Sequence, residues 1–351
     1  MAHSVLLAWT LRLGRHTAAR ATRSFSTASS SPSAVDQMIE YALGQQKSNP
    51  DMAVDILRSG LSYPNQLPAD TARLHLALAR TEAGRDNWVV AAAAAVAAAG
   101  RLAAALGPDP GGALRSQPEL ADAVAALGLW RACSGQQGAA EAALAAAGEA
   151  EAAAAAAEGA ASGEALVRKQ HHHEVEAEAL AGRAQLQMWG REWGPAEELL
   201  GSALKAAEAA HGERSPALAS LLLLLGYTYS RSARVTFAEG LFREAAKLLR
   251  LDPARQQQQQ QQQCGGAHAS VGAVLAWRYA QLLWVLPNRG NEAAVWERCA
   301  RHLWGGCGPL GSQGLEAVLG GQAHLKGEGP EGAGLLLSTR LRRALPLLPA
   351  A

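Results

Sequence analysis

The sequence predicts an all-α protein, an α-solenoid of stacked antiparallel helical hairpins. The chain is rich in Ala and Leu, and aromatic residues make up only 5% of it, a composition that favours helices. Strictly alternating runs of β-branched residues are scarce, and helical segments recur along the chain. One helical hairpin cannot bury its own apolar faces, so several are expected to stack.

The clearest hairpin is predicted between His211 and Leu249. Ser215 and Pro216 begin its first helix, because Pro is tolerated in a first helical turn. Five leucines follow at 221–225, far fewer than the roughly 20 apolar residues that a membrane span needs. The polar sequence SRSAR then separates this helix from a second one. The apolar run is therefore interpreted as protein core.

Small residues lie where the two helices of this hairpin should touch. Gly226 in the first helix and Ala238 in the second would allow a close approach. Leu225, Tyr229 and Phe242 would fill the space around that contact. These positions are predicted to be structural.

Three positions of the second helix recur upstream with a period of 42 residues. They pair as Ala196 with Ala238, Leu200 with Phe242, and Ala203 with Ala245. A constant period of this length indicates a repeated supersecondary unit.

The segment LLGYTYSRSARVTFAEGLFREAA resembles the tetratricopeptide repeat, in its 42-residue variety known from kinesin light chains. It keeps the family's Leu-Gly pair, its Tyr, its Ala-Glu pair and the aromatic residue before Ala. A weaker copy contains Leu127, Gly128, Ala140 and Leu144, and a last one is expected to include Leu319 and Leu336. The resemblance covers residues 36–345. It implies a non-catalytic protein that binds one or more partner proteins in the groove of the solenoid.

The repeats are not evenly spaced, because low-complexity inserts are expected near 107–112, 145–163 and 254–267. Such inserts fit loops, where extra length costs only about 0.6 kcal/mol per doubling. The Ala-rich insert could equally extend a helix. The best repeats fall within 180–250, and residues 346–351 are expected to form a tail.

The first 35 residues are predicted to be a transit peptide followed by a disordered linker. They contain no Asp or Glu, carry four arginines and end in a Ser/Thr-rich run. The sequence RSFS resembles a mitochondrial processing site, which places cleavage at Arg23 and Phe25. We expect a mitochondrial location, in the matrix or associated with the inner membrane, with the chloroplast as second choice.

The charge argues against nucleic-acid binding. The formal net charge of the chain is +1, and removing residues 1–25 with their four arginines changes it to −3. Nucleic-acid-binding domains need a basic stripe to displace counterions. An organellar RNA-binding helical-repeat protein is the alternative, and it would need basic residues that recur in successive repeats.

Motifs for catalysis, metals or cofactors are weak. The HHHE sequence, His171–Glu174, is interpreted as a solvated polar tract, because adjacent residues of a helix point in different directions. Cys299 and Cys307 lack a second close pair of ligands. We expect no cofactor, no bound metal, no transmembrane segment and no small-molecule ligand. Six tryptophans are expected to be core residues for the most part, with a few as binding anchors, and the sequence does not distinguish the two groups: Trp189, Trp193, Trp277, Trp284, Trp296 and Trp304. The predicted function is a scaffold or adaptor, such as an assembly or accessory factor of a respiratory or other large organellar complex.

Overall fold

The computed structural model describes residues 33–46, 48–64, 66–106, 114, 119–157, 163–253, 266–307, 313–321 and 334–347. The chain divides into two compact units, residues 1–37 and 38–351. The described part of the first unit begins helix α2 (Ala34–Gln45) with a capping box. The Ser33 N–H donates to Asp36 Oδ2 at 2.9 Å, and the Asp36 N–H donates to Ser33 Oγ at 3.1 Å.

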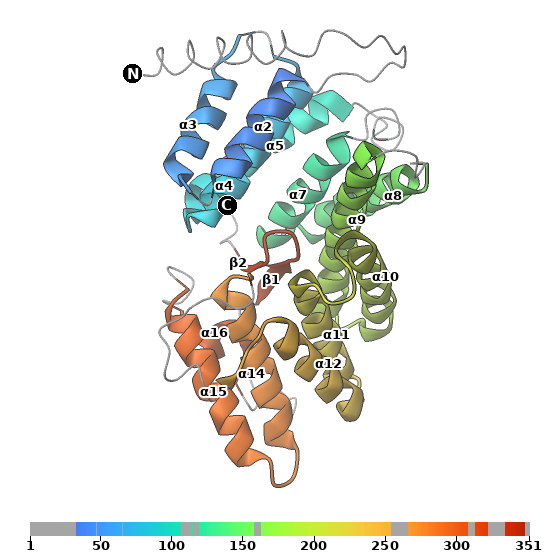
Figure 1. Ribbon diagram of the computed structural model, residues 1–351, viewed down its shortest axis with the longest axis vertical. Coiled ribbons are helices and arrows are strands. Elements are labelled where there is room, and N and C mark those ends of the chain that lie inside the picture. Colours follow the sequence, from blue (N-terminus) through green and yellow to red (C-terminus); the bar gives the residue numbers. More distant parts are fainter. Residues whose placement is uncertain are drawn as a thin grey trace. The chain divides into compact units, whose positions relative to one another are not determined.

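The second unit consists mainly of helices that pack in antiparallel pairs along the chain (Figure 1). Helix α3 (Pro50–Leu61) packs against the first of these pairs. The pairs are α4 (Pro68–Gly84) with α5 (Trp88–Leu106), α7 (Glu119–Cys133) with α8 (Gln137–Ala157), α9 (Gly163–Trp189) with α10 (Trp193–His211), α11 (Ala219–Arg231) with α12 (Val235–Leu248), and α14 (Ala269–Val285) with α15 (Gly290–Gly305). A 3₁₀ turn, Pro216–Leu218, precedes α11, and Leu315–Leu319 form the short helix α16. The predicted α-solenoid of helical hairpins is confirmed by this packing.

A tight turn joins the two helices of each pair, of three residues in the first four pairs and of four residues between α14 and α15. Its second-last residue is in the left-handed region, at Asp86, Gly135, Arg191, Ala233 and Asn288, with φ between 59° and 76°. In the first four turns the next N–H donates to the carbonyl five positions earlier at 2.9 Å, as from Arg234 to Tyr229. The left-handed residues Arg191 and Ala233 are 42 positions apart, which is the predicted period.

The repeated turn places the second helices in a common register. The fifth residue after the left-handed position is a fully buried alanine in every pair: Ala91, Ala140, Ala196, Ala238 and Ala293. Glycine on the first helix allows close packing in two of the pairs. A Cβ atom at Gly226 would lie 2.9 Å from Phe242 Cε1, and one at Gly128 would lie 2.6 Å from Leu144 Cγ. A small residue facing a large one therefore builds these contacts.

The predicted inserts have different outcomes. Of the two expectations for 145–163, a loop insert or an extended helix, the structure shows the helix, α8, up to Ala157, and α9 begins at Gly163. Buried residues such as Ala147 and Glu151 belong to that helix, in keeping with the helix propensity of alanine. The segment 107–112 lies outside the described residues, and of 254–267 only Gly266 and Ala267 are described.

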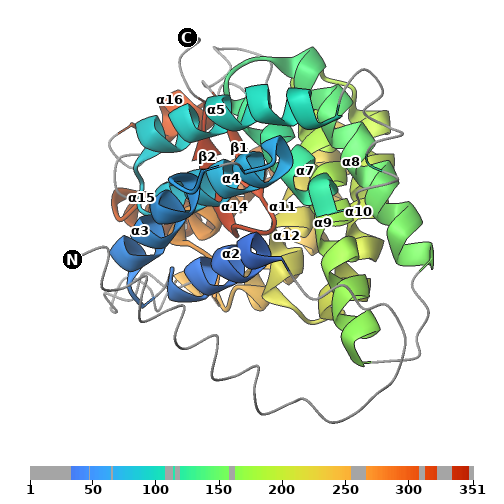
Figure 2. The same ribbon diagram turned by 90° about the horizontal axis from the view of Figure 1, so that it is seen from above.

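Residues 334–347 form strands and a turn instead of a helix. Strands β1 (Leu335–Ser338) and β2 (Arg343–Pro346) form an antiparallel hairpin in which Leu336 faces Leu345 and Leu335 faces Pro346. The expectation that Leu336 belongs to a repeat helix is wrong, and Pro346 belongs to β2 rather than to a tail. The hairpin lies among the helices in both views (Figure 1; Figure 2), and Ser270 of α14 accepts from the Ala344 N–H at 2.9 Å.

Helix α5 is the one helix of the described residues that is long and apolar enough to cross a membrane by those criteria alone, with a mean hydropathy of 2.0. One of its faces, which includes Ala91, Ala95 and Leu102, is buried. Val89 and Val96 on the other face are 81% and 70% exposed. Helix α5 therefore meets the length and hydropathy criteria of a membrane span, and in this structure one of its faces packs against α4.

Candidate binding site

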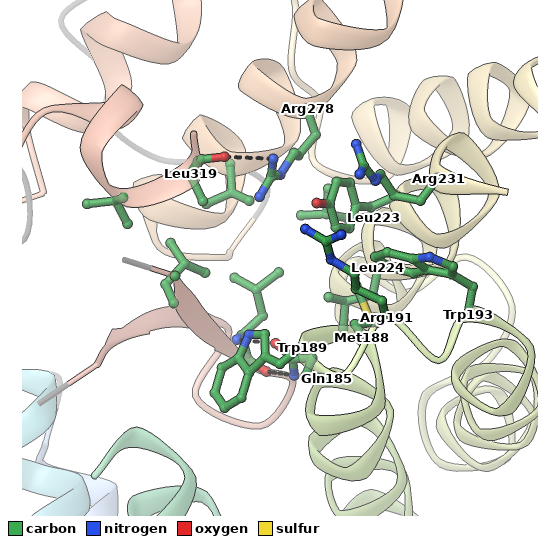
Figure 3. A pocket seen from close by; sticks show the side chains of 16 residues that line it. Gln185, Met188, Trp189, Arg191, Trp193, Leu223, Leu224, Arg231, Arg278 and Leu319 are labelled. Atoms are coloured by element: carbon green, nitrogen blue, oxygen red, sulfur yellow. Dashed lines mark hydrogen bonds between the residues drawn. The ribbon is translucent and has the colours of Figure 1, made fainter. Parts of the chain in front are cut away.

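A pocket of about 130 Å³ lies between helices α9, α11 and α14 on one side and α16 and β1 on the other (Figure 3). Its polar and aromatic lining is formed by Gln185, Trp189, Arg191, Trp193, Tyr227, Arg231 and Arg278. Leucines, valines and Met188 form the rest of the wall, apart from Gly334. None of the described residues that line it is acidic. We call this site the arginine–aromatic pocket.

The first helices of three successive pairs present these side chains at intervals of four residues. Gln185 and Trp189 lie on α9, Tyr227 and Arg231 on α11, and Val274 and Arg278 on α14. Residues four apart share one face of a helix. Arg191 comes from the tight turn that follows α9, and Trp193 is the first residue of α10. The hairpin repeat thus brings distant parts of the sequence to one pocket.

Two arginines of the pocket lie against its aromatic rings. The Arg278 guanidinium carbon lies 4.1 Å from the centre of the Tyr227 ring, and that of Arg231 lies 5.8 Å from the Trp193 ring. The Trp193 and Tyr227 rings meet edge to face, with centroids 6.0 Å apart. Cation–π contacts of this kind hold a guanidinium in place without neutralising its charge.

Arg278 is half-buried and is held by neutral oxygen atoms. Its Nη1 donates to the Leu319 carbonyl at 2.8 Å and to Gln281 Oε1 at 3.0 Å. Within the described parts of the chain, no carboxylate pairs with it. Burial lowers the pKa of Arg278 below its ordinary value, and the charge of Arg231 lowers it further, while Tyr227 opposes the shift. A carboxylate that entered the pocket would therefore meet a poorly compensated positive charge.

Strand β1 forms one wall of the pocket because α9 binds its backbone. Gln185 Oε1 accepts from the Leu337 N–H at 2.7 Å, and Gln185 Nε2 donates to the Leu337 carbonyl at 3.0 Å. The Gly334 N–H donates to the Val318 carbonyl at 2.8 Å, which ties β1 to α16. Gly334 has a φ of 82°, a conformation that favours glycine.

The turn of the β-hairpin is held by a buried carboxylate. Glu178 of α9 accepts from the Thr339 N–H at 2.6 Å and from the Arg340 N–H at 3.2 Å, and also from the hydroxyls of Ser338 and Thr339. Its exposure is only 3%. A carboxylate that accepts several hydrogen bonds in the interior fixes its partners firmly.

Two arginines of the same hairpin pair with other helices. Arg340 binds Asp122 of α7, while Arg343 binds Asp86 and donates to the Ala83 carbonyl at 2.8 Å. Burial alone would raise the pKa of Asp122, but its ion pair and hydrogen bond with Arg340 hold that pKa well below its usual range. With the Ser270 contact to Ala344, the hairpin is anchored to four helical pairs by polar contacts.

The predicted repeat-signature residues lie between helices and not in the pocket. The buried ones are Leu127, Gly128, Ala140, Leu144, Ala196, Leu200, Ala203, Leu225, Gly226, Ala238, Phe242 and Ala245. Tyr229 is half-buried beneath Arg234, whose guanidinium carbon lies 4.1 Å from the centre of its ring. The predicted processing site, Arg23 and Phe25, lies outside the described residues.

Two histidines of the His-rich sequence in α9 each contact a different carboxylate. His172 binds Glu151, and His173 Nδ1 lies 3.2 Å from Glu176 Oε2. Within the described residues no three or more His, Cys, Asp or Glu side chains are grouped as a metal ion would need. Cys299 and Cys307 are buried, and the Cys307 thiol donates to the Leu303 carbonyl at 3.2 Å.

Of the six tryptophans that the sequence offered as core residues or binding anchors, Trp189 and Trp193 line the pocket. The sequence did not single them out, and Arg191, Arg231 and Arg278 were missed. A signal was available in the four-residue spacing of large polar and aromatic residues on the first helices. This spacing can be recognised only when the positions of the turns between the helices are known. The left-handed residues that mark those turns include Arg and Ala as well as Asp, Asn and Gly, so residue type alone does not locate them. The role of β1 could not be read from local sequence.

No protein-family model matches the chain, and no curated protein is similar to it in sequence. Among solved structures, the chain is similar to the crystal structure of BtubC (BKLC) from P. vanneervenii, with 15% sequence identity and a TM-score of 0.41. The similarity covers 85% of this chain and 95% of that one. These values do not assign a family or transfer a binding partner. The helical-hairpin architecture is therefore established by the packing of the described helices themselves.

Proposed function

We propose that this chain is a non-catalytic scaffold that binds an acidic segment of a partner protein in the arginine–aromatic pocket. The observation that carries the proposal is Arg278, a half-buried guanidinium that has no carboxylate partner among the described residues. Arg191 and Arg231 line the same pocket, and none of its described lining residues is acidic. Electrostatic complementarity therefore favours a carboxylate-bearing ligand.

The composition of the pocket favours a protein over a small molecule. Trp, Tyr and Arg are the residues that contribute most binding energy at protein interfaces, and all three are present here. Large apolar side chains such as Leu223 and Met188 lie beside them. A peptide that carries one acidic and one apolar side chain could use both parts of the wall.

The location and the wider role are extensions of this proposal. The basic, acid-free N-terminus supports import into mitochondria. A protein-binding solenoid there would suit an assembly or accessory factor of a respiratory or other large complex. The RNA-binding alternative would use the same arginines and aromatic rings for phosphates and bases, so the experiment must separate the two.

The test is affinity purification of the tagged full chain from gently solubilised organelles, with and without nuclease, followed by mass spectrometry. Wild type is compared with a double variant, Arg191→Gln with Arg278→Gln, and with the control Arg214→Gln, an exposed residue outside the pocket. We expect a nuclease-resistant set of proteins that falls at least tenfold in the double variant and persists in the control. An unchanged set in the double variant would contradict the proposal, and nuclease-sensitive capture would favour RNA binding.

A further inference from the structure

The edge of strand β1 offers backbone groups to the arginine–aromatic pocket. In an antiparallel pair, residues that face each other alternate between hydrogen-bonded and non-hydrogen-bonded pairs. Leu337 gives both of its backbone groups to Gln185, and the Ala344 N–H donates to Ser270 Oγ. Leu337 and Ala344 face each other, so they form a non-hydrogen-bonded pair.

The same alternation fixes the direction of the Leu335 backbone. Leu335 faces Pro346, two positions further along the ladder, so this pair is also non-hydrogen-bonded. Proline has no N–H to donate, which agrees with that assignment. The N–H and carbonyl of Leu335 therefore point away from β2, toward the edge that Leu337 presents to Gln185. Among the described residues, no backbone outside the hairpin bonds to them.

On this edge Leu337 is already occupied, and Gly334, the residue before Leu335, is bound to α16, so Leu335 alone is left open. Gln185 acts at Leu337 as a neighbouring strand would, because its amide both accepts and donates. At the other end, the Gly334 N–H is bound by the Val318 carbonyl. Leu335 lies between them, and both Leu335 and Leu337 line the pocket. An edge with open backbone groups is a template for strand addition.

The positive charge of the pocket lies next to this edge. Arg278 binds the carbonyl of Leu319, the residue after Val318, and the Val318 carbonyl binds Gly334 beside Leu335. A segment that pairs with Leu335 would thus have its side chains close to the Arg278 guanidinium. A second copy of the hairpin would not suit this position, because its strands and turn carry arginines and no acid.

We propose that the partner's acidic segment binds in an extended conformation, with one residue paired to the backbone of Leu335 and a nearby carboxylate bound by Arg278. The inference rests on the proposed function and specifies how the ligand is recognised. Backbone pairing would fix the register of the segment, and the arginines would select its charge.

The test uses the full chain and three synthetic probes: hexaglutamate, hexaglutamate N-methylated at every backbone amide, and hexaglutamine. N-methylation removes the donors that strand pairing needs and leaves the carboxylates in place. Binding is followed by the NMR signals of the tryptophan indole groups, and hydrogen exchange is measured at the Leu335 and Leu337 amides. We expect hexaglutamate to bind at least tenfold more tightly than either other probe. It should slow exchange at Leu335 and leave Leu337, already bound by Gln185, unchanged.

The outcomes separate the two proposals. If the N-methylated peptide binds as tightly as hexaglutamate, or if exchange at Leu335 stays fast in the complex, strand pairing is overturned and recognition by charge survives. If hexaglutamate binds no better than hexaglutamine, the proposed acidic ligand fails, and the pairing model fails with it. Because the probes change and the protein does not, neither result can be attributed to misfolding.

Discussion

The helical pairs and the C-terminal β-hairpin are held together by different forces. The helical pairs depend on shape, as where Phe242 fills the space left by Gly226. The β-hairpin depends on polar contacts, in which Glu178, Asp122 and Asp86 bind its turn and its arginines. The comparison teaches that a repeat array can be built from local apolar packing, while the element that completes the pocket needs partners far away in the sequence.

Removing a core ring should give the largest effect on global stability. Phe242 is fully buried, so Phe242→Ala should lower the free energy of unfolding by about 3–5 kcal/mol. Phe237 on the same helix is 66% exposed, and Phe237→Ala should cost less than about 1 kcal/mol. Chemical denaturation of both variants measures the difference. Equal losses would contradict the assignment of Phe242 to the core.

Removing the carboxylate of Glu178 should loosen the β-hairpin first. Glu178→Gln replaces one acceptor oxygen by an NH₂ group that faces the donors of Ser338 and Thr339, at a cost of about 1–3 kcal/mol. Hydrogen exchange at the Thr339 and Arg340 amides should accelerate, while exchange within α11 and α12 stays slow. The control is Glu198→Gln at an exposed position. Uniform acceleration across the chain would show that the hairpin does not open separately.

Two glycine substitutions should have opposite signs. Gly226→Ala places a Cβ atom 2.9 Å from Phe242 and should destabilise the chain by about 1 kcal/mol or more. Gly240 has no heavy atom within 4 Å of an added Cβ, so Gly240→Ala should stabilise helix α12 by about 0.5–1 kcal/mol. Thermal unfolding of the pair checks the sign. Stabilisation by both would mean that α11 and α12 are not closely packed at Gly226.

The smallest expected effect is a pH dependence at the start of α14. Burial lowers the pKa of His268, and Arg343 lowers it further, while Asp86 opposes the shift. The unfolded chain then binds a proton more readily than the folded one. Stability should be complete above the unfolded value of about 6.5 and should fall as the pH drops from there toward the lowered folded pKa. His268→Asn keeps a cap acceptor for the Ser270 N–H and should reduce this slope in denaturation curves at pH 8 to 5.

The sequence was most informative where structure depends on near neighbours. The 42-residue period follows from the repeated helical hairpin, and Gly226 was expected at the close contact with the second helix. That contact was expected with Ala238, but the large residue Phe242 lies against Gly226. The β-hairpin was missed because the sequence LLLSTRLRRALP has no strong turn signal, and because its main partners, Asp86, Asp122 and Glu178, are more than 150 residues away. The pocket was missed for the same reason, since one of its walls is that hairpin.

The central claim is that Arg278 makes the pocket a receptor for carboxylates. The most direct measurement is a tryptophan-fluorescence titration of the full chain with hexaglutamate and hexaglutamine, in wild type, Arg278→Gln and the control Arg214→Gln. We predict saturable binding of hexaglutamate to wild type and control, at least tenfold weaker binding to Arg278→Gln with an unchanged helical circular dichroism spectrum, and little binding of hexaglutamine. Equal affinity of folded Arg278→Gln and wild type for hexaglutamate would contradict the account.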